Sequence, residues 1–88
     1  MVSYRIEFKH SAERDLRKLS YPVVSRLLDR IEGLAEMPFP RQSLKLSAVE
    51  KTYRLRIGVY RVIYDVDEEH ETVTIHYIRH RREAYRNV

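Results

Sequence analysis

Residues 53–64 read Tyr-Arg-Leu-Arg-Ile-Gly-Val-Tyr-Arg-Val-Ile-Tyr, and this segment decides the fold of the chain. On either side of Gly58, every second side chain is apolar or aromatic. Such period-two alternation is typical of a strand with one buried face. Glycine in the first position of a two-residue loop favours a type II′ turn. The segment therefore predicts a β-hairpin that reverses at Gly58 and Val59.

The two faces of this hairpin differ in chemistry. A two-residue loop makes one face wholly apolar or aromatic, with the opposed pairs Tyr53 and Tyr64, Leu55 and Val62, Ile57 and Tyr60. The other face carries Arg54 beside Ile63, and Arg56 directly opposite Arg61. Like charges opposed across a sheet are destabilising. We therefore expect the arginine face either to splay into water or to hold an anion.

The composition predicts one small basic domain over residues 1–88. The 88 residues are 43% hydrophobic and 34% charged, with a net charge of +4 and a pI near 9.6. A basic domain of this size suits nucleic acid, an acidic protein partner or an anionic surface. The chain has no cysteine, which excludes disulfides, thiolate zinc sites and cysteine nucleophiles. Because the N-terminus has no apolar signal core and no apolar run is of membrane-spanning length, we expect a cytoplasmic protein.

The first half of the chain predicts a strand followed by two helices. Residues 3–9 alternate as a half-buried strand, and Ser11 is expected to cap a first helix that ends near Ser20. Pro22 suits the first turn of a second helix, which carries a broad apolar face through residue 35. Pro38 and Pro40 stop this helix. We expect the helical pair to cover the apolar face of the hairpin.

The second half extends the sheet. Residues 44–46 predict a brief strand and residues 48–51 a turn before the hairpin. After an exposed acidic turn at residues 67–70, residues 72–79 alternate again. If that turn holds an even number of residues, Val73, Ile75 and Tyr77 join the apolar face, while Thr74, His76 and Ile78 join the arginine face. His76 would then neighbour Arg61.

The tail at residues 80–88 predicts a final helical turn with Arg81 and Tyr85 on one side. The expected fold is therefore α+β: an N-terminal strand, a helical hairpin, an antiparallel sheet of three to four strands and a short C-terminal helix. The arginine face stays uncovered, with the tail at its rim.

Three segments taken together resemble the RelE/ParE superfamily of toxin–antitoxin toxins. They are Tyr-Arg-Leu-Arg at 53–56, Tyr-Arg-Val-Ile-Tyr at 60–64 and His-Arg-Arg-Glu-Ala-Tyr at 80–85. The strand, two helices and proline-containing loop before them are also similar, so the resemblance covers nearly the whole chain. RelE-like members are endoribonucleases that cut mRNA in the ribosomal A site, whereas ParE-like members poison DNA gyrase.

The RelE pattern of basic and tyrosine residues matches Arg54, Arg56, Arg61, Arg81 and Tyr85. Three details depart from the best-known type. The hairpin pair, often lysine there, is arginine here; a histidine, His80, stands directly before Arg81; and the spacing from Arg81 to Tyr85 is shorter.

These residues suit metal-free RNA cleavage, in which the 2′-hydroxyl attacks the adjacent phosphate. Arginine binds phosphate oxygens bidentately and stays charged. We therefore expect a clamp for the anionic transition state that is made of Arg54, Arg56, Arg61 and Arg81. Arginine is a poor base, so His80 is the first candidate for that role and His76 the second. Tyr85 is expected to stack on a base or assist proton transfer. Arg82 and His76 are added as phosphate contacts, and no metal or other cofactor is expected.

Each assignment has a structural alternative. The hairpin arginines would otherwise form a solvated face, His76 a polar strand residue, Tyr85 a ring packed on the core, and Arg81 with Arg82 merely a basic end. The favoured reading is a RelE-like endoribonuclease that cuts ribosome-bound mRNA and is silenced by a RelB-like antitoxin. The rivals are a ParE-like gyrase inhibitor and a catalytically inactive basic binding module.

Overall fold

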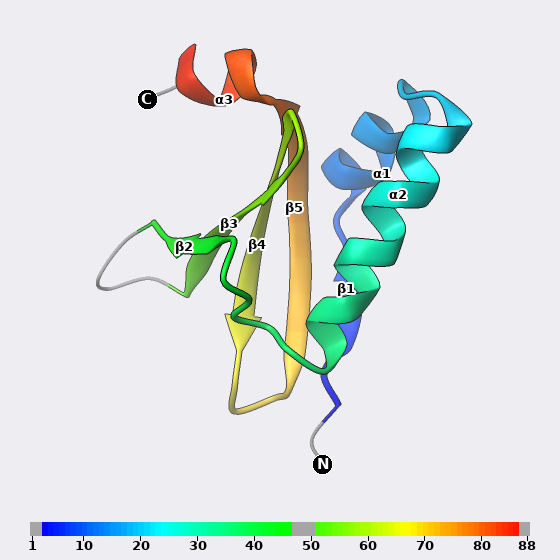
Figure 1. The fold of residues 1–88 in the computed structure, drawn as a ribbon. Coiled ribbons are helices and arrows are strands. Elements are labelled where there is room, and N and C mark those ends of the chain that lie inside the picture. The colour runs from blue at the N-terminus through cyan, green and yellow to red at the C-terminus, as the bar shows by residue number, and fades with distance from the viewer. Residues whose placement is uncertain (1–2, 47–50, 87–88) are drawn as a thin grey trace.

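The computed structural model describes residues 3–46 and 51–86, and it places two helices against one face of a five-stranded sheet (Figure 1). The first elements are β1 (Arg5–Phe8), α1 (His10–Arg17), α2 (Tyr21–Glu32) and the 3₁₀ turn η1 (Gly33–Ala35). The remaining elements are β2 (Ser43–Lys45), β3 (Thr52–Ile57), β4 (Tyr60–Asp67), β5 (Thr72–His80) and α3 (Arg81–Arg86). The predicted fold class and the order of its elements are confirmed. The turn expected at residues 48–51 lies largely outside the described residues.

The sheet has the strand order β1-β5-β4-β3-β2. Strands β2 to β5 pair antiparallel, whereas β1 and β5 run parallel. The first and last strands of the chain therefore lie side by side. Helices α1 and α2 stand on one side of the sheet, and α3 projects from its end toward the other side (Figure 1). The face that carries the hairpin arginines is left without a helical layer.

The hairpin of β3 and β4 has the predicted register. Arg56 pairs with Arg61, Leu55 with Val62 and Tyr53 with Tyr64. Gly58 has a φ of 59°, while Val59 is not among the residues with positive φ. A positive φ at the first loop residue alone fits the expected type II′ turn.

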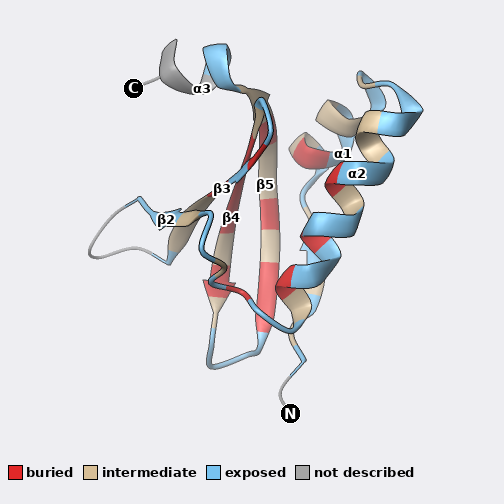
Figure 2. Ribbon diagram, in the orientation of Figure 1, coloured by how far each residue is buried: buried red, intermediate tan, exposed pale blue. Residues whose placement is uncertain are grey.

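The core lies between the apolar face of the sheet and the two helices. Its largest fully buried side chains come from α2, η1 and the three central strands: Leu27, Ile31, Leu34, Leu55, Val62, Tyr64, Val73 and Ile75. Figure 2 shows the buried residues on the strands and on the helix surfaces that face them. Burying this apolar surface is the main source of stability in a domain of this size.

Helix α1 begins differently from the prediction. It starts at His10, and its N-cap residue Lys9 makes no side-chain capping bond. Ser11, the expected cap, lies inside the first turn and donates a hydrogen bond from Oγ to the backbone oxygen of His76. The prediction was wrong because a hydrogen bond to β5, distant in sequence, takes the hydroxyl that a local cap would use.

Strand β5 has a bulge that changes the predicted faces of its second half. Ile63 pairs with Tyr77 but Tyr64 pairs with Ile75, so His76 is an extra residue in the ladder. Side chains after the bulge exchange faces. Tyr77 therefore lies on the arginine face and Ile78 is buried in the core, the reverse of the prediction. The prediction that His76 neighbours Arg61 was also wrong, because Arg61 pairs with Arg79.

Candidate functional site

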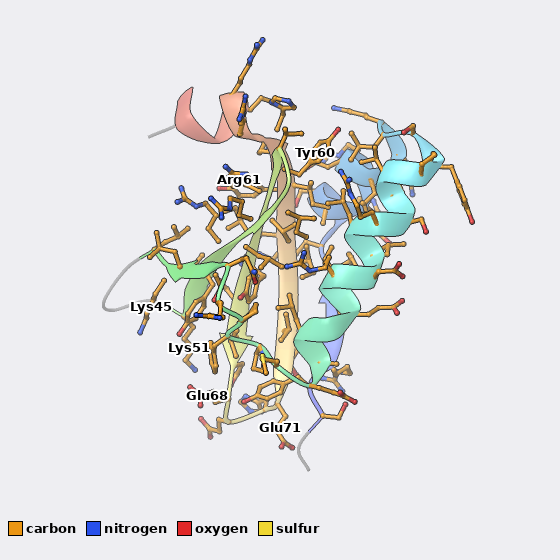
Figure 3. The ribbon with its side chains drawn as sticks, viewed as in Figure 1. Lys45, Lys51, Tyr60, Arg61, Glu68 and Glu71 are labelled. Atoms are coloured by element: carbon orange, nitrogen blue, oxygen red, sulfur yellow. The ribbon has the colours of Figure 1, made fainter. Side chains whose placement is uncertain are left out.

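Four arginines line one polar pocket on the face of the sheet opposite the helices. Its lining residues are Arg41, Gln42, Ser43, Leu44, Arg54, Arg56 and Arg61, and its volume is about 230 Å³. We call it the arginine pocket. None of these seven described residues is acidic. Figure 3 shows Arg61 on the side of the sheet away from α2. The arrangement concentrates positive charge where an anion can enter.

The hairpin turn holds Arg61 in place. The residue is only 5% exposed, and its Nη1 donates to the backbone oxygens of Gly58, at 3.1 Å, and Tyr60, at 2.9 Å. Arg56, directly opposite, is exposed. The pair therefore consists of one anchored guanidinium and one that is open to solvent.

The sequence analysis missed Arg41, which lies in the loop before β2. Two hydrogen bonds hold the loop, one on each side of Arg41. The Tyr64 hydroxyl donates to the Pro38 oxygen at 2.8 Å, and the Arg56 N–H donates to the Gln42 oxygen at 3.2 Å. Burial raises the pKa of Tyr64 to about 12, so its hydroxyl keeps the proton that it donates. The only sequence signal for Arg41 was a basic residue next to Pro40, and it belongs to no alternating pattern.

Helix α3 begins beside the hairpin turn. The backbone N–H of Arg81 donates to the backbone oxygen of Val59 at 2.6 Å. Arg81 and Arg82 are both exposed. The side chain of Tyr85 lies outside the described residues. The structure thus places the start of the basic tail at the end of the hairpin that carries Arg56 and Arg61.

His80 caps α3. Its Nδ1 accepts a hydrogen bond from the Arg82 N–H at 3.3 Å, and its own N–H donates to Glu83 Oε1 at 3.2 Å. This reciprocal pattern is that of a capping box. Because Nδ1 accepts, the proton of the neutral ring lies on Nε2. The ring also lies edge-on to Tyr60, with centroids 5.8 Å apart.

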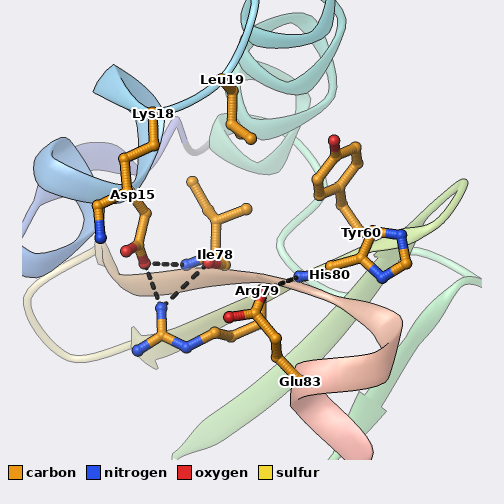
Figure 4. A pocket seen from close by; sticks show the side chains of 8 residues that line it. All are labelled: Asp15, Lys18, Leu19, Tyr60, Ile78, Arg79, His80 and Glu83. Atoms are coloured by element: carbon orange, nitrogen blue, oxygen red, sulfur yellow. Dashed lines mark hydrogen bonds and ion pairs between the residues drawn. The ribbon is translucent and has the colours of Figure 1, made fainter.

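His80 also lines a second pocket, separate from the arginine pocket. This pocket has a volume of about 240 Å³, and it is lined by Asp15, Lys18, Leu19, Tyr60, Ile78, Arg79, His80 and Glu83 (Figure 4). Its walls come from α1, the turn that follows α1, and the ends of β4, β5 and α3. The structure therefore brings the three hairpin arginines together in one pocket and His80 into another.

His76 lies away from both pockets. Its Nε2 is 2.8 Å from Asp65 Oδ2, and the other oxygen of Asp65 accepts a hydrogen bond from Thr52 at 2.7 Å. The bulge turns the ring toward Asp65 on the neighbouring strand. Within residues 3–46 and 51–86 there is no group of three or more His, Asp or Glu side chains placed to hold a metal ion. No helix in this part of the chain is long and apolar enough to cross a membrane.

Known proteins are similar to this chain over nearly its full length. The family model of the ParE toxin of the type II toxin–antitoxin system parDE matches residues 6–85. Toxin RelG of Mycobacterium tuberculosis is 32% identical over 97% of this chain and 99% of its own. The putative toxin RelE1 of Methanocaldococcus jannaschii is 28% identical over 98% of this chain and 99% of its own.

Solved structures have the same fold. A chain of the RelBE2 toxin–antitoxin complex of M. tuberculosis superposes with a TM-score of 0.79 at 32% identity, over 90% of this chain and 99% of its own. A chain of the RelE–RelB complex of Pyrococcus horikoshii gives a TM-score of 0.82 at 28% identity, over 91% of this chain and 97% of its own.

Proposed function

The chain belongs to the ParE toxin family of type II toxin–antitoxin systems and is RelE-like, and we propose that it is a metal-independent endoribonuclease that cuts ribosome-bound mRNA. The arginine pocket is the observation that carries this proposal. Three of its four arginines come from a hairpin whose sheet pairing places Arg56 against Arg61. Like charges opposed across a sheet are unfavourable, and an anion bound between or above the two side chains would offset that cost. The phosphate of an RNA strand is such an anion.

In the proposed reaction, a 2′-hydroxyl attacks the neighbouring phosphorus and the 5′-oxygen of the next nucleotide leaves. The bond from phosphorus to that 5′-oxygen breaks, so the products carry a 2′,3′-cyclic phosphate and a 5′-hydroxyl. Arg54, Arg56 and Arg61, with Arg81 reaching in from α3, stabilise the extra negative charge of the pentacoordinate phosphorane. Preorganised cations of this kind act without reorganising during the reaction. Arg82 is proposed as a further phosphate contact, and His76, which lies outside the arginine pocket beside Asp65, as a contact of a phosphate farther along the RNA.

The reaction also needs a base for the 2′-hydroxyl and a proton for the leaving oxygen. His80 is the proposed base, with His76 as the second candidate. Because His80 lines the other pocket, its ring must move to reach a 2′-hydroxyl held at the arginine pocket. To accept a proton at Nε2, His80 must first carry its own proton on Nδ1, which requires it to release the Arg82 N–H. Base catalysis by His80 is therefore coupled to a rearrangement at the start of α3. Tyr85 is proposed to stack on a base of the substrate or to assist proton transfer.

The proposed partner is a RelB-like antitoxin. The similar toxins of M. tuberculosis and P. horikoshii were solved in complexes with RelB proteins. The basic face and the exposed apolar side chains, which include Met37 and Leu44, offer a partner both charge and apolar contact.

The test is cleavage of a defined mRNA in purified translating ribosomes, with a gyrase supercoiling assay in parallel. We expect cuts in the A-site codon that leave cyclic phosphate ends. The cuts should persist when EDTA removes other metal ions and Mg²⁺ is kept only at the level that ribosomes need. Arg56→Gln should reduce cleavage, whereas Arg14→Gln, which removes the same charge from an exposed position on α1, should not. Inhibited supercoiling without cuts would instead identify a gyrase poison. A protein that neither cleaves nor inhibits would be a binding module.

A further inference from the structure

Arg41 extends the arginine pocket beyond the hairpin. Across the sheet, Arg56 is flanked on one side by Arg61 of β4, its register partner. On the other side its N–H donates to the oxygen of Gln42, which follows Arg41 directly. Neighbouring chains in a sheet lie about 4.8 Å apart. The backbone at Gln42, the residue after Arg41, is therefore about 10 Å from the backbone at Arg61, on the opposite side of Arg56.

The loop that carries Arg41 is held by specific contacts. Ser43 donates to the Pro40 oxygen twice, from its N–H at 2.9 Å and from Oγ at 2.6 Å. The Phe39 ring packs on Tyr53 with centroids 5.1 Å apart. With the bond from Tyr64 to Pro38, these contacts fix the chain on both sides of Arg41. A backbone that is already ordered loses less conformational entropy when an anion binds.

The charge of the pocket exceeds what one phosphodiester needs. Four guanidinium groups line it, and none of its described lining residues is acidic. A phosphodiester carries a single negative charge, and a phosphorane about one more. The surplus, spread over two strand spacings, matches a second phosphate of the same RNA strand.

We propose that Arg41 binds the phosphate next to the scissile one, so that the arginine pocket holds two consecutive phosphates of single-stranded RNA. The inference rests on the proposed function in taking the ligand to be RNA. Arg54, Arg56 and Arg61 surround the reacting phosphate, and Arg41 holds its neighbour on the β2 side. Arg41 thus sets the register of the RNA in the pocket and takes no part in the chemical step.

The test compares two ligands whose 2′-hydroxyls are methylated to block cleavage: a dinucleotide with one phosphate and a trinucleotide with two. Binding to the wild type, Arg41→Gln and Arg41→Lys is measured by NMR titration at low salt. We expect Arg41→Gln to bind the trinucleotide roughly threefold to tenfold more weakly and the dinucleotide equally well. Arg41→Lys, which keeps the charge, should restore most of the trinucleotide affinity. Arg14→Gln is the control for net charge.

Salt dependence gives a second readout on a longer methylated oligouridylate. Loss of one single-strand phosphate contact should reduce the slope of log affinity against log salt by about 0.7. Equal affinities of Arg41→Gln and wild type for the trinucleotide would overturn the inference, as would equal weakening for both ligands. If the wild type still cuts ribosome-bound mRNA in that case, the proposed function stands and only the second phosphate subsite falls. Failure of the wild type to bind either ligand would overturn the phosphate pocket itself.

Discussion

The carboxylate of Asp15 on α1 lies 2.5 Å from Nη1 of Arg79 on β5. The same carboxylate oxygen accepts the backbone N–H of Ile78 at 2.9 Å. β1 ends at Phe8, opposite Ile75, so the part of β5 beyond Ile75 has no strand on that side. Helix α1 supplies the missing hydrogen bonds. An edge that would otherwise expose unpaired backbone is thereby closed by side chains.

Replacing Asp15 by alanine should lower the free energy of unfolding by about 2 kcal/mol. The change leaves the Ile78 N–H and the Arg79 guanidinium without their shared acceptor in a half-buried position. Urea unfolding followed by circular dichroism measures the loss. Glu7→Ala is the control, because Glu7 pairs with Arg5 on the exposed surface, where such pairs contribute at most about 1 kcal/mol. Equal losses in the two variants would contradict a structural role for Asp15.

Tyr64 should make the protein sensitive to alkali. Burial raises the pKa of Tyr64 to about 12, whereas an unfolded tyrosine ionises near pH 10. The unfolded state therefore loses its proton first, so the contribution of Tyr64 to stability is complete below pH 10 and is lost between about pH 10 and 12. Urea midpoints across this range should fall less steeply in Tyr64→Phe than in the wild type.

The matched control for that titration is Tyr21→Phe, since the Tyr21 side chain is 83% exposed. Its urea midpoints should follow the wild-type curve. If Tyr64→Phe also followed that curve, the alkaline loss would have another source.

The face opposite the helices should show a trade between stability and anion binding. Arg56→Gln removes one of two like charges that oppose each other across β3 and β4, so in chloride buffer the variant should be more stable by about 0.5 kcal/mol. Inorganic phosphate at equal ionic strength should stabilise the wild type more than the variant, because it binds the folded state alone. Melting temperatures in the two buffers give the comparison, and Arg14→Gln controls for net charge. A less stable Arg56→Gln in chloride would refute the repulsion.

The sequence was sufficient for the hairpin because its signals are local. A glycine at the turn and a strict two-residue period determine which side chains oppose one another, so Arg56 and Arg61 could be paired without coordinates. β5 followed the same period only as far as Ile75. The extra residue at His76 has no signature in composition, and after it every side chain changes face.

Two features of the site depend on contacts that sequence spacing does not reveal. Arg41 enters the arginine pocket because Tyr64 and Arg56, both distant in the chain, hold its loop. His80 replaces the serine or threonine that usually marks a capping box, so His80 and Glu83 gave no familiar start signal for α3. The pattern of titratable residues pointed to catalysis, whereas the backbone contacts of His80 indicate a cap.

Two substitutions at His80 should separate its capping role from its proposed role as base. Asparagine is a favoured N-cap residue but does not titrate, whereas alanine can do neither. If His80 is the base, both variants should slow single-turnover cleavage by about 100-fold or more and change the pH dependence of the rate. Only His80→Ala should also weaken α3, measured by amide hydrogen exchange. A wild-type rate and pH profile in His80→Asn would leave His80 with the cap alone.

Arg81 should matter more for the chemical step than for binding. Its backbone N–H to Val59 survives in Arg81→Ala, so α3 keeps its place and only the guanidinium is lost. A charge that acts in the transition state should affect the rate at saturating substrate by about 100-fold, with less than about tenfold change in affinity. Single-turnover cleavage on programmed ribosomes separates the two quantities.

Arg82→Ala is the matched control. Because Arg82 is proposed as a phosphate contact, its loss should weaken the affinity and the salt dependence of binding while leaving the saturated rate near that of the wild type. Equal saturated rates for Arg81→Ala and wild type would remove Arg81 from the clamp.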